Sequence, residues 1–119
     1  MPSGLQKSFR QVAVVNTAVV VEAGNWAIAG WNLINPISTS AYLKFYNSAT
    51  AGAVTVGTTT PLMTVLIPAA GTFWQSNEDQ FQMGFNLGIV VAVTTGIADN
   101  DTAAPATGCY VQLFYNTNQ

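Results

Sequence analysis

The residues best suited to chemistry lie in a short acidic stretch near the end of the chain. Asp99 and Asp101 are two positions apart in Asp99-Asn100-Asp101-Thr102, and this spacing in a loop can present carboxylate oxygens to Ca²⁺. The rest of the EF-hand pattern is missing, since there is no glycine at the sixth loop position and no glutamate at the twelfth. Aspartate and asparagine also form turns on their own. We therefore expect Asp99 and Asp101 to shape a turn, with calcium binding as the alternative.

Other combinations of catalytic residues are scarce. The chain has no histidine, which removes the usual general base, most metal sites and every Ser–His or Cys–His arrangement. Glu78 and Asp79 adjoin each other, but they lie in the polar stretch 75–80, which indicates a solvated loop. We therefore expect that the chain is not an enzyme, that it has no catalytic or metal-binding residue, and that it binds no cofactor.

The composition is unusual in its charge. Half of the 119 residues are hydrophobic and only 7% are charged, against about 25% in a typical domain. Three basic residues and a net charge of −2 exclude the clustered lysines and arginines that bind nucleic acid or an anionic membrane surface. A single domain with so little charge must expose Thr and Asn residues to stay soluble, or have its surface covered by a neighbouring protein.

Two local features have structural interpretations. Cys109 is the only cysteine, so it forms no intrachain disulfide; we interpret it as a buried small residue, with an intermolecular bridge or a reactive thiol as alternatives.

Lys7 and Arg10 precede the apolar run 12–21, as in a signal peptide. That run is rich in valine and is interrupted by Asn16 and Thr17, which favours a strand instead.

Strand signals fill the chain, whereas helical periodicity is nearly absent. Short runs of Val, Ile, Thr and aromatic residues are bounded by Gly, Pro, Asn and Ser. They predict about eight strands, and hence an all-β sandwich or small barrel, with an antiparallel sandwich of jelly-roll type as the first choice. We expect an N-terminal arm at 1–10 and one domain at 11–119. The expected strands are 11–21, 25–34, 41–46, 61–67, 71–74, 81–85, 88–95 and 110–115.

The alternation within two strands predicts an interaction surface. Lys44 must point away from the core, because an unpaired buried ammonium is costly, and a period of two sends Tyr42 and Tyr46 the same way. In the last strand, Gln112 marks the outer face by the same argument. The residues expected on outward faces, and hence in contact with partners, are Tyr42, Tyr46, Tyr110 and Phe114.

Two further patterns concern partners. The segments 88–95 and 62–67 are apolar on both faces, and with no helix to cover the second face we expect a second subunit to do so. Trp26, Trp31 and Trp74 suit a core or an interface, with stacking on sugar rings as the alternative. Trp26 and Trp31 are five positions apart and should point to opposite faces of a regular strand.

Several motifs resemble those of short virion proteins of tailed bacteriophages. They are the segments 42–47, 56–58 leading to Pro61, 67–71, 94–102 and 111–115, and the similarity extends over roughly residues 24–115. The resemblance implies a capsid decoration (cement) protein, a homotrimer seated on the outside of the shell formed by the major capsid protein. The alternatives are a tail, collar or fibre-tip domain, and a carbohydrate- or calcium-binding β-sandwich outside any virus.

Overall fold

The chain folds into short strands joined by turns and two longer loops. The computed structural model describes residues 6–75 and 83–117, which contain nine strands and one turn of 3₁₀ helix, η1 (Ala51–Ala53). No helix in these ranges is long and apolar enough to cross a membrane. The strands are β1 (Lys7–Val14), β2 (Val19–Ala23), β3 (Trp26–Ile34), β4 (Ala41–Asn47), β5 (Met63–Ile67), β6 (Thr72–Gln75), β7 (Met83–Phe85), β8 (Gly88–Thr94) and β9 (Cys109–Thr117).

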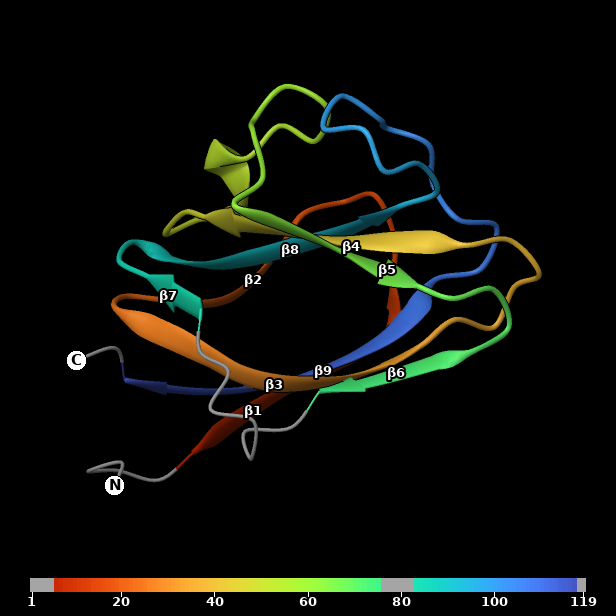
Figure 1. Ribbon diagram of the computed structural model, residues 1–119. Coiled ribbons are helices and arrows are strands. Elements are labelled where there is room, and N and C mark those ends of the chain that lie inside the picture. Colours follow the sequence, from red (N-terminus) through yellow and green to blue (C-terminus); the bar gives the residue numbers. More distant parts are fainter. Residues whose placement is uncertain (1–5, 76–82, 118–119) are drawn as a thin grey trace.

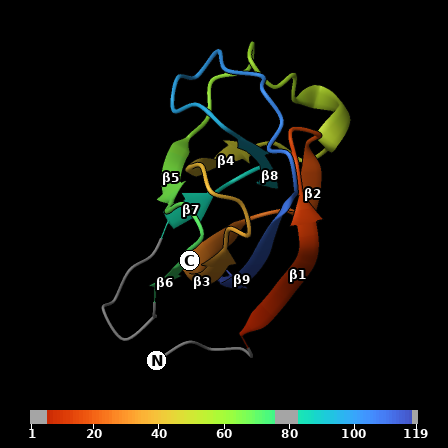
Figure 2. The same cartoon turned by 90° about the vertical axis from the view of Figure 1, so that its right-hand side faces the viewer.

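The strands form two antiparallel sheets stacked face to face (Figures 1 and 2). One sheet has the order β1-β9-β3-β6, with β7 also paired to β3, and the other has the order β2-β8-β4-β5. Strands β6 and β7 pair with successive parts of the same edge of β3 and together occupy one strand position. If β6 and β7 are counted as one strand, the sandwich has eight strands, and their order in the two sheets is that of a jelly roll. This confirms the fold class predicted from the sequence.

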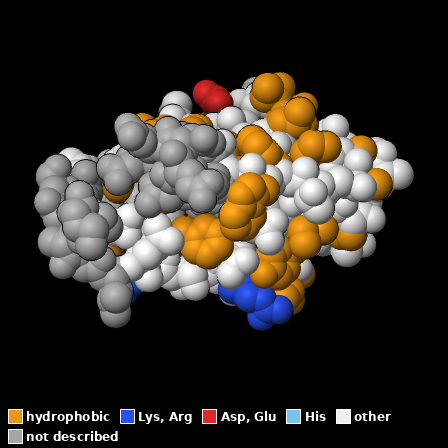
Figure 3. Space-filling model, turned by 60° about the horizontal axis from the view of Figure 1, so that its bottom comes forward, with side chains coloured by type: hydrophobic (Ala, Val, Ile, Leu, Met, Phe, Trp, Pro, Cys, Tyr) orange, Lys and Arg blue, Asp and Glu red, His pale blue; other side chains and the backbone are white. Residues whose placement is uncertain are grey.

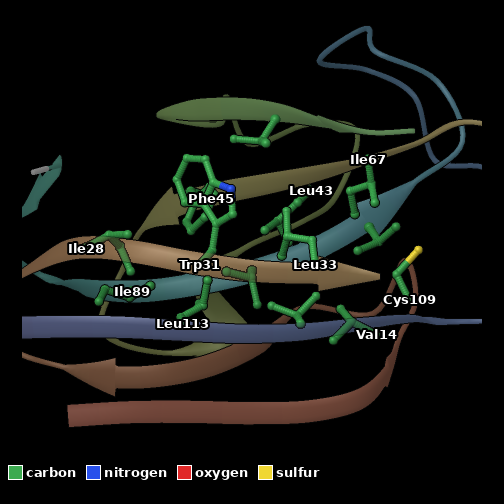
Figure 4. Close-up of a cluster of buried hydrophobic side chains, with 14 of the residues drawn as sticks. Val14, Ile28, Trp31, Leu33, Leu43, Phe45, Ile67, Ile89, Cys109 and Leu113 are labelled. Atoms are coloured by element: carbon green, nitrogen blue, oxygen red, sulfur yellow. The ribbon is translucent and has the colours of Figure 1, made fainter. Parts of the chain in front are cut away.

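The main core lies between the two sheets and follows the alternation of the strands. Figure 4 shows Trp31 and Leu33 of β3 facing Leu43 and Phe45 of β4. The rings of Trp31 and Phe45 lie 5.9 Å apart between their centroids. Leu43 and Phe45, which alternate with the outward Lys44, are both fully buried in this core.

The first predicted strand is in fact two strands. The chain leaves one sheet after Val14 and enters the other at Val19, so the segment with Asn16 and Thr17 that interrupts the apolar run is the crossing between sheets. Strand β1 begins at Lys7, and its first residues pair with β9. Residues 7–10 of the expected arm therefore belong to the sheet, whereas residues 1–5 and part of the predicted strand 81–85 lie outside the described residues.

The expectation that Trp26 and Trp31 point to opposite faces is wrong. The register between β3 and β9 shifts between Ile28 and Gly30, and such a bulge reverses the alternation beyond it. Trp31 is therefore in the main core, and Trp26 packs against the same core with its ring edge-on to Tyr115, 5.4 Å away between centroids.

The outer face of the four-stranded sheet is covered over β8 by loops of the same chain, so the apolar outer side of β8 needs no second subunit to bury it. In the other segment that is apolar on both faces, Leu62 and Leu66 stay exposed, and a covering subunit there stays a prediction. Val90 and Ala92 of β8 point away from the main core and form a second cluster with Tyr46 and Val54. Loop 48–62 supplies Val54, and loop 95–108 lies over Lys44. This explains why β8 is apolar on both faces and fully buried.

The two covering loops are joined to each other. Gly57 has a φ of +93°, a conformation that favours glycine, and a Cβ at this position would collide with the methyl group of Thr102 in the other loop. The side chain of Asn16 donates a hydrogen bond of 3.0 Å to the carbonyl oxygen of Thr102. The loops therefore form one layer over the sheet.

Candidate interaction face

The first two residues expected at an interface lie on β4, where the structure gives a mixed result. Tyr42 is half-buried, but Tyr46 is fully buried beneath loop 48–62. Both point away from the main core, as the alternation predicted, yet the exposure expected for Tyr46 is wrong because the loop covers it. Burial, with the negative charge of Asp99 as a smaller cause, raises the pKa of the Tyr46 hydroxyl.

Lys44 lies between these tyrosines and is also fully buried. Its ammonium group donates a hydrogen bond to the carbonyl oxygen of Ala98, in the loop above the sheet. The prediction that Lys44 points away from the main core is confirmed, since its ammonium group lies on the outer face of β4. The sequence could not reveal that a backbone carbonyl would accept a hydrogen bond from the ammonium group on that face and allow its burial.

The outer face of the five-stranded sheet, in contrast, carries exposed side chains, among them Trp74 and Ile34. Its side chains form rows across the strands, since residues paired in register share a face. One row runs through Arg10, Gln112, Asn32 and Trp74, on β1, β9, β3 and β6. The next row contains Tyr110 and Ile34, and Phe114 lies on the other side of the first row. We call Trp74, Tyr110, Phe114 and Ile34 the aromatic face.

The aromatic face is held together by ring contacts. Trp74 is 60% exposed, and its ring meets that of Phe114 edge-on with centroids 6.0 Å apart. Phe114 pairs with Gly30 of β3. Figure 3 shows hydrophobic side chains gathered over this side of the molecule.

Arg10 is the charged residue of this face. Its Nε donates a hydrogen bond of 3.3 Å to the hydroxyl of Tyr110, and its guanidinium lies 5.5 Å from the centroid of the same ring. The Tyr110 hydroxyl in turn donates to Gln112 Oε1 at 3.3 Å. Tyr110 is therefore fixed in place, while Arg10 has no carboxylate partner among residues 6–75 and 83–117.

The structure thus brings together two of the four residues predicted for the interface, Tyr110 and Phe114. Tyr42 and Tyr46 lie on the opposite sheet. Ile34 was not predicted for this face, and Trp74 was left open between a core and an interface position, because the sequence does not reveal which strands are neighbours. Trp74 alternates with the half-buried Phe73, and this short pattern was the only local signal of its outward direction.

The acidic stretch forms a turn. The Asp101 carboxylate accepts a hydrogen bond of 2.9 Å from the backbone N–H of Ala103, as an Asx turn requires. The same carboxylate packs against Gly96, where a Cβ would collide with it. In the described part of the chain, no three Asp, Glu, Cys or His side chains gather as metal ligands would. That Asp99 and Asp101 do not bind calcium stays a prediction.

One partly exposed polar cluster ties the edge strands of the two sheets together. The Lys7 ammonium of β1 lies 3.0 Å from a carboxylate oxygen of Glu22 on β2, and Glu22 also accepts a 2.7 Å hydrogen bond from the hydroxyl of Tyr115. The Tyr115 hydrogen bond is the main cause that lowers the pKa of the Glu22 carboxyl, with Lys7 adding to it against the opposing effect of burial. The Lys7 ammonium also lies 4.7 Å from the centroid of the Trp26 ring.

Replacing Tyr115 with Phe should therefore destabilise the fold in a pH-dependent way. A pKa lower in the folded state gives stability that is present above the unfolded pKa and is lost as the pH falls through the folded pKa. We expect Tyr115→Phe to cost about 1 kcal/mol near neutral pH, because a hydrogen bond to a partly exposed carboxylate is lost. Urea unfolding near pH 7 and near pH 3 measures it; an equal cost at both values would contradict the assignment.

Cys109 is fully buried in the main core, and burial raises the pKa of its thiol to about 11. The native protein should therefore react with a thiol reagent only when it unfolds, because the thiolate is the reactive form. Cys109→Ser should keep the fold at a cost of about 1–2 kcal/mol. Rapid labelling of the folded chain, or a disulfide-linked dimer in its native form, would contradict this.

Comparisons with known proteins add little to this geometry. No family model and no curated protein matches the chain. One solved structure, described as Bacillus endospore appendages that form "a novel family of disulfide-linked pili", aligns over 96% of this chain and 86% of that chain. The identity is 18% and the TM-score is 0.47. A likeness at this level assigns no function.

Proposed function

We propose that this chain is a non-enzymatic structural subunit that binds another protein through its aromatic face. The observation that carries the proposal is a group of exposed and half-buried rings on one face of a sheet, with Arg10 as its charged residue. Trp, Tyr and Arg are the residue types most enriched among interface hot spots. Charged residues are depleted in the cores of such interfaces, as they are on this face.

The role that we propose for the subunit is capsid decoration in a tailed bacteriophage, with the major capsid protein as partner and the outer surface of the virion as its location. Two observations support it. The segments listed above resemble virion proteins of this kind, and viral capsid domains are among the proteins that use a jelly roll. The fold by itself is shared with lectins and enzymes, so the decoration role rests mainly on the resemblance, whereas binding to a partner rests on the aromatic face.

A second candidate function is glycan binding by the same face. Trp74 lies directly across from Asn32, which pairs with Gln112 on its other side. An exposed indole beside two amides could stack on a sugar ring while the amides bind its hydroxyl groups. This reading predicts binding to soluble oligosaccharides that is lost in Trp74→Ala, whereas the protein-interface reading predicts none.

The experiment that tests the proposed role is quantitative mass spectrometry of virions purified from a phage that carries this sequence. A decoration protein should be present in hundreds of copies, in a fixed ratio to the major capsid protein. A few copies for each virion would indicate a tail, collar or fibre part. Absence of the protein from purified particles would overturn the virion role while leaving the binding face to be tested separately.

A further inference from the structure

The strands of residues 6–75 and 83–117 leave four sheet edges at which backbone groups are open to another strand, and three of these edges are protected. Strand β1 carries Lys7 and Arg10 and a register shift between Gln11 and Val14. Strand β2 carries Glu22 and a shift between Val20 and Glu22. The third edge is divided between the short strands β6 and β7. Charges, bulges and short edge strands are the devices by which proteins prevent strands of different molecules from pairing.

The fourth edge, β5, has none of these protections. Its sequence Met-Thr-Val-Leu-Ile has no charged residue and no proline, and it pairs with β4 without a register shift. It lies at the end of its sheet, on the opposite side from β2 (Figure 2). No other strand of the described chain pairs with its outer edge.

The side chains along β5 also suit a contact. Leu62 and Leu66 are 48% and 47% exposed, and Leu66 is directly across from the half-buried Tyr42. On the inner face, Val65 and Ile67 belong to the main core. Pro61 and Pro68 stand just outside the strand and limit any added pairing to a short segment, because proline cannot donate to a sheet.

We propose that β5 pairs antiparallel with β5 of a second copy, so that two four-stranded sheets become one continuous sheet. A second copy fits because the edge has no charge, and a two-fold pairing of the strand with itself therefore brings no like charges together. The same strand is used by both copies, so the contact is closed and produces a dimer rather than a fibre. This inference goes beyond the proposed function, which depends on the other sheet, and it replaces the trimer implied by the resemblance.

The first test compares two lysine variants by sedimentation velocity over the micromolar range. Leu66→Lys places a charge on the open edge and should weaken dimerisation at least about tenfold, since each dimer loses two buried leucines and gains two close charges. Val20→Lys is the matched control, because Val20 is similarly exposed on the protected edge strand β2. It should dimerise as the wild type does. Circular dichroism should show both variants folded.

A mixing experiment separates self-pairing from pairing with a different protein. Leu66→Lys and Leu66→Glu should each be monomeric alone, and an equimolar mixture should form heterodimers, because the two copies place opposite charges near each other. A monomeric wild type, equal dissociation by Val20→Lys, or a mixture that stays monomeric would each overturn the proposal. Phe114→Asp should leave the dimer intact, so failure of the aromatic face to bind a particle does not affect this result.

Discussion

Phe114→Asp is expected to release the protein from its partner while the sandwich stays folded. Phe114 lies on the outer face of β9, where its ring contacts Trp74 and not the main core. A carboxylate here remains in contact with water in the free chain, but is desolvated when a partner covers the aromatic face. We expect binding to weaken by about 2 kcal/mol or more, which corresponds to roughly a 30-fold change in Kd.

The measurement is retention on virions after purification, with heat release of DNA as a second readout. Leu87→Asp is the matched control, since Leu87 is an exposed apolar residue in the turn between β7 and β8, away from the aromatic face. It should bind normally. Virions that keep their full complement of Phe114→Asp protein and their thermal resistance would contradict the assignment of the face.

The same substitution at Tyr46 is expected to have the opposite outcome. Tyr46 is fully buried among Val54, Val90 and Ala92, so Tyr46→Asp removes a large ring and places a carboxylate in an apolar site. We expect a loss of about 4 kcal/mol or more, enough to unfold many domains of this size. Thermal unfolding followed by circular dichroism measures it.

A conservative variant makes this second prediction sharper. The Tyr46 hydroxyl is buried and has no hydrogen-bond partner among residues 6–75 and 83–117, so Tyr46→Phe should leave stability unchanged or raise it slightly. A folded, soluble Tyr46→Asp protein would show that loop 48–62 leaves the sheet readily. In that case Tyr46 would be exposed on the outer face of β4, as the sequence predicted.

The contrast between Phe114 and Tyr46 shows how far the sequence could be interpreted. Alternation assigned both residues to the outer face of their strands, and both assignments are confirmed. Whether an outer face is open depends on long-range packing. Loop 48–62 closes over one sheet through Val54, a residue with no local pattern that distinguishes it from an exposed loop valine.

Which strands lie next to each other in the two sheets also could not be predicted from the sequence. Trp74 and Phe114 are 40 positions apart and meet because β6 and β9 both pair with β3. The bulge between Ile28 and Gly30 likewise depends on pairing with β9 and moved Trp26 to the core side. The approximate positions of most strands, by contrast, follow from local composition, and the jelly-roll type was predicted from them, although the first predicted strand is in fact β1 and β2.

Hydroxyl-radical footprinting of Trp74 tests the central claim most directly, because it reports whether the aromatic face is covered. In the free protein Trp74 should be oxidised rapidly, as expected for a ring that is 60% exposed, while the buried Trp31 in the same sample serves as the protected reference. In protein bound to purified virions, oxidation of Trp74 should fall toward the level of Trp31. Equal oxidation of Trp74 in the free and bound protein would contradict the account, since the aromatic face would then be open to water in the assembled state.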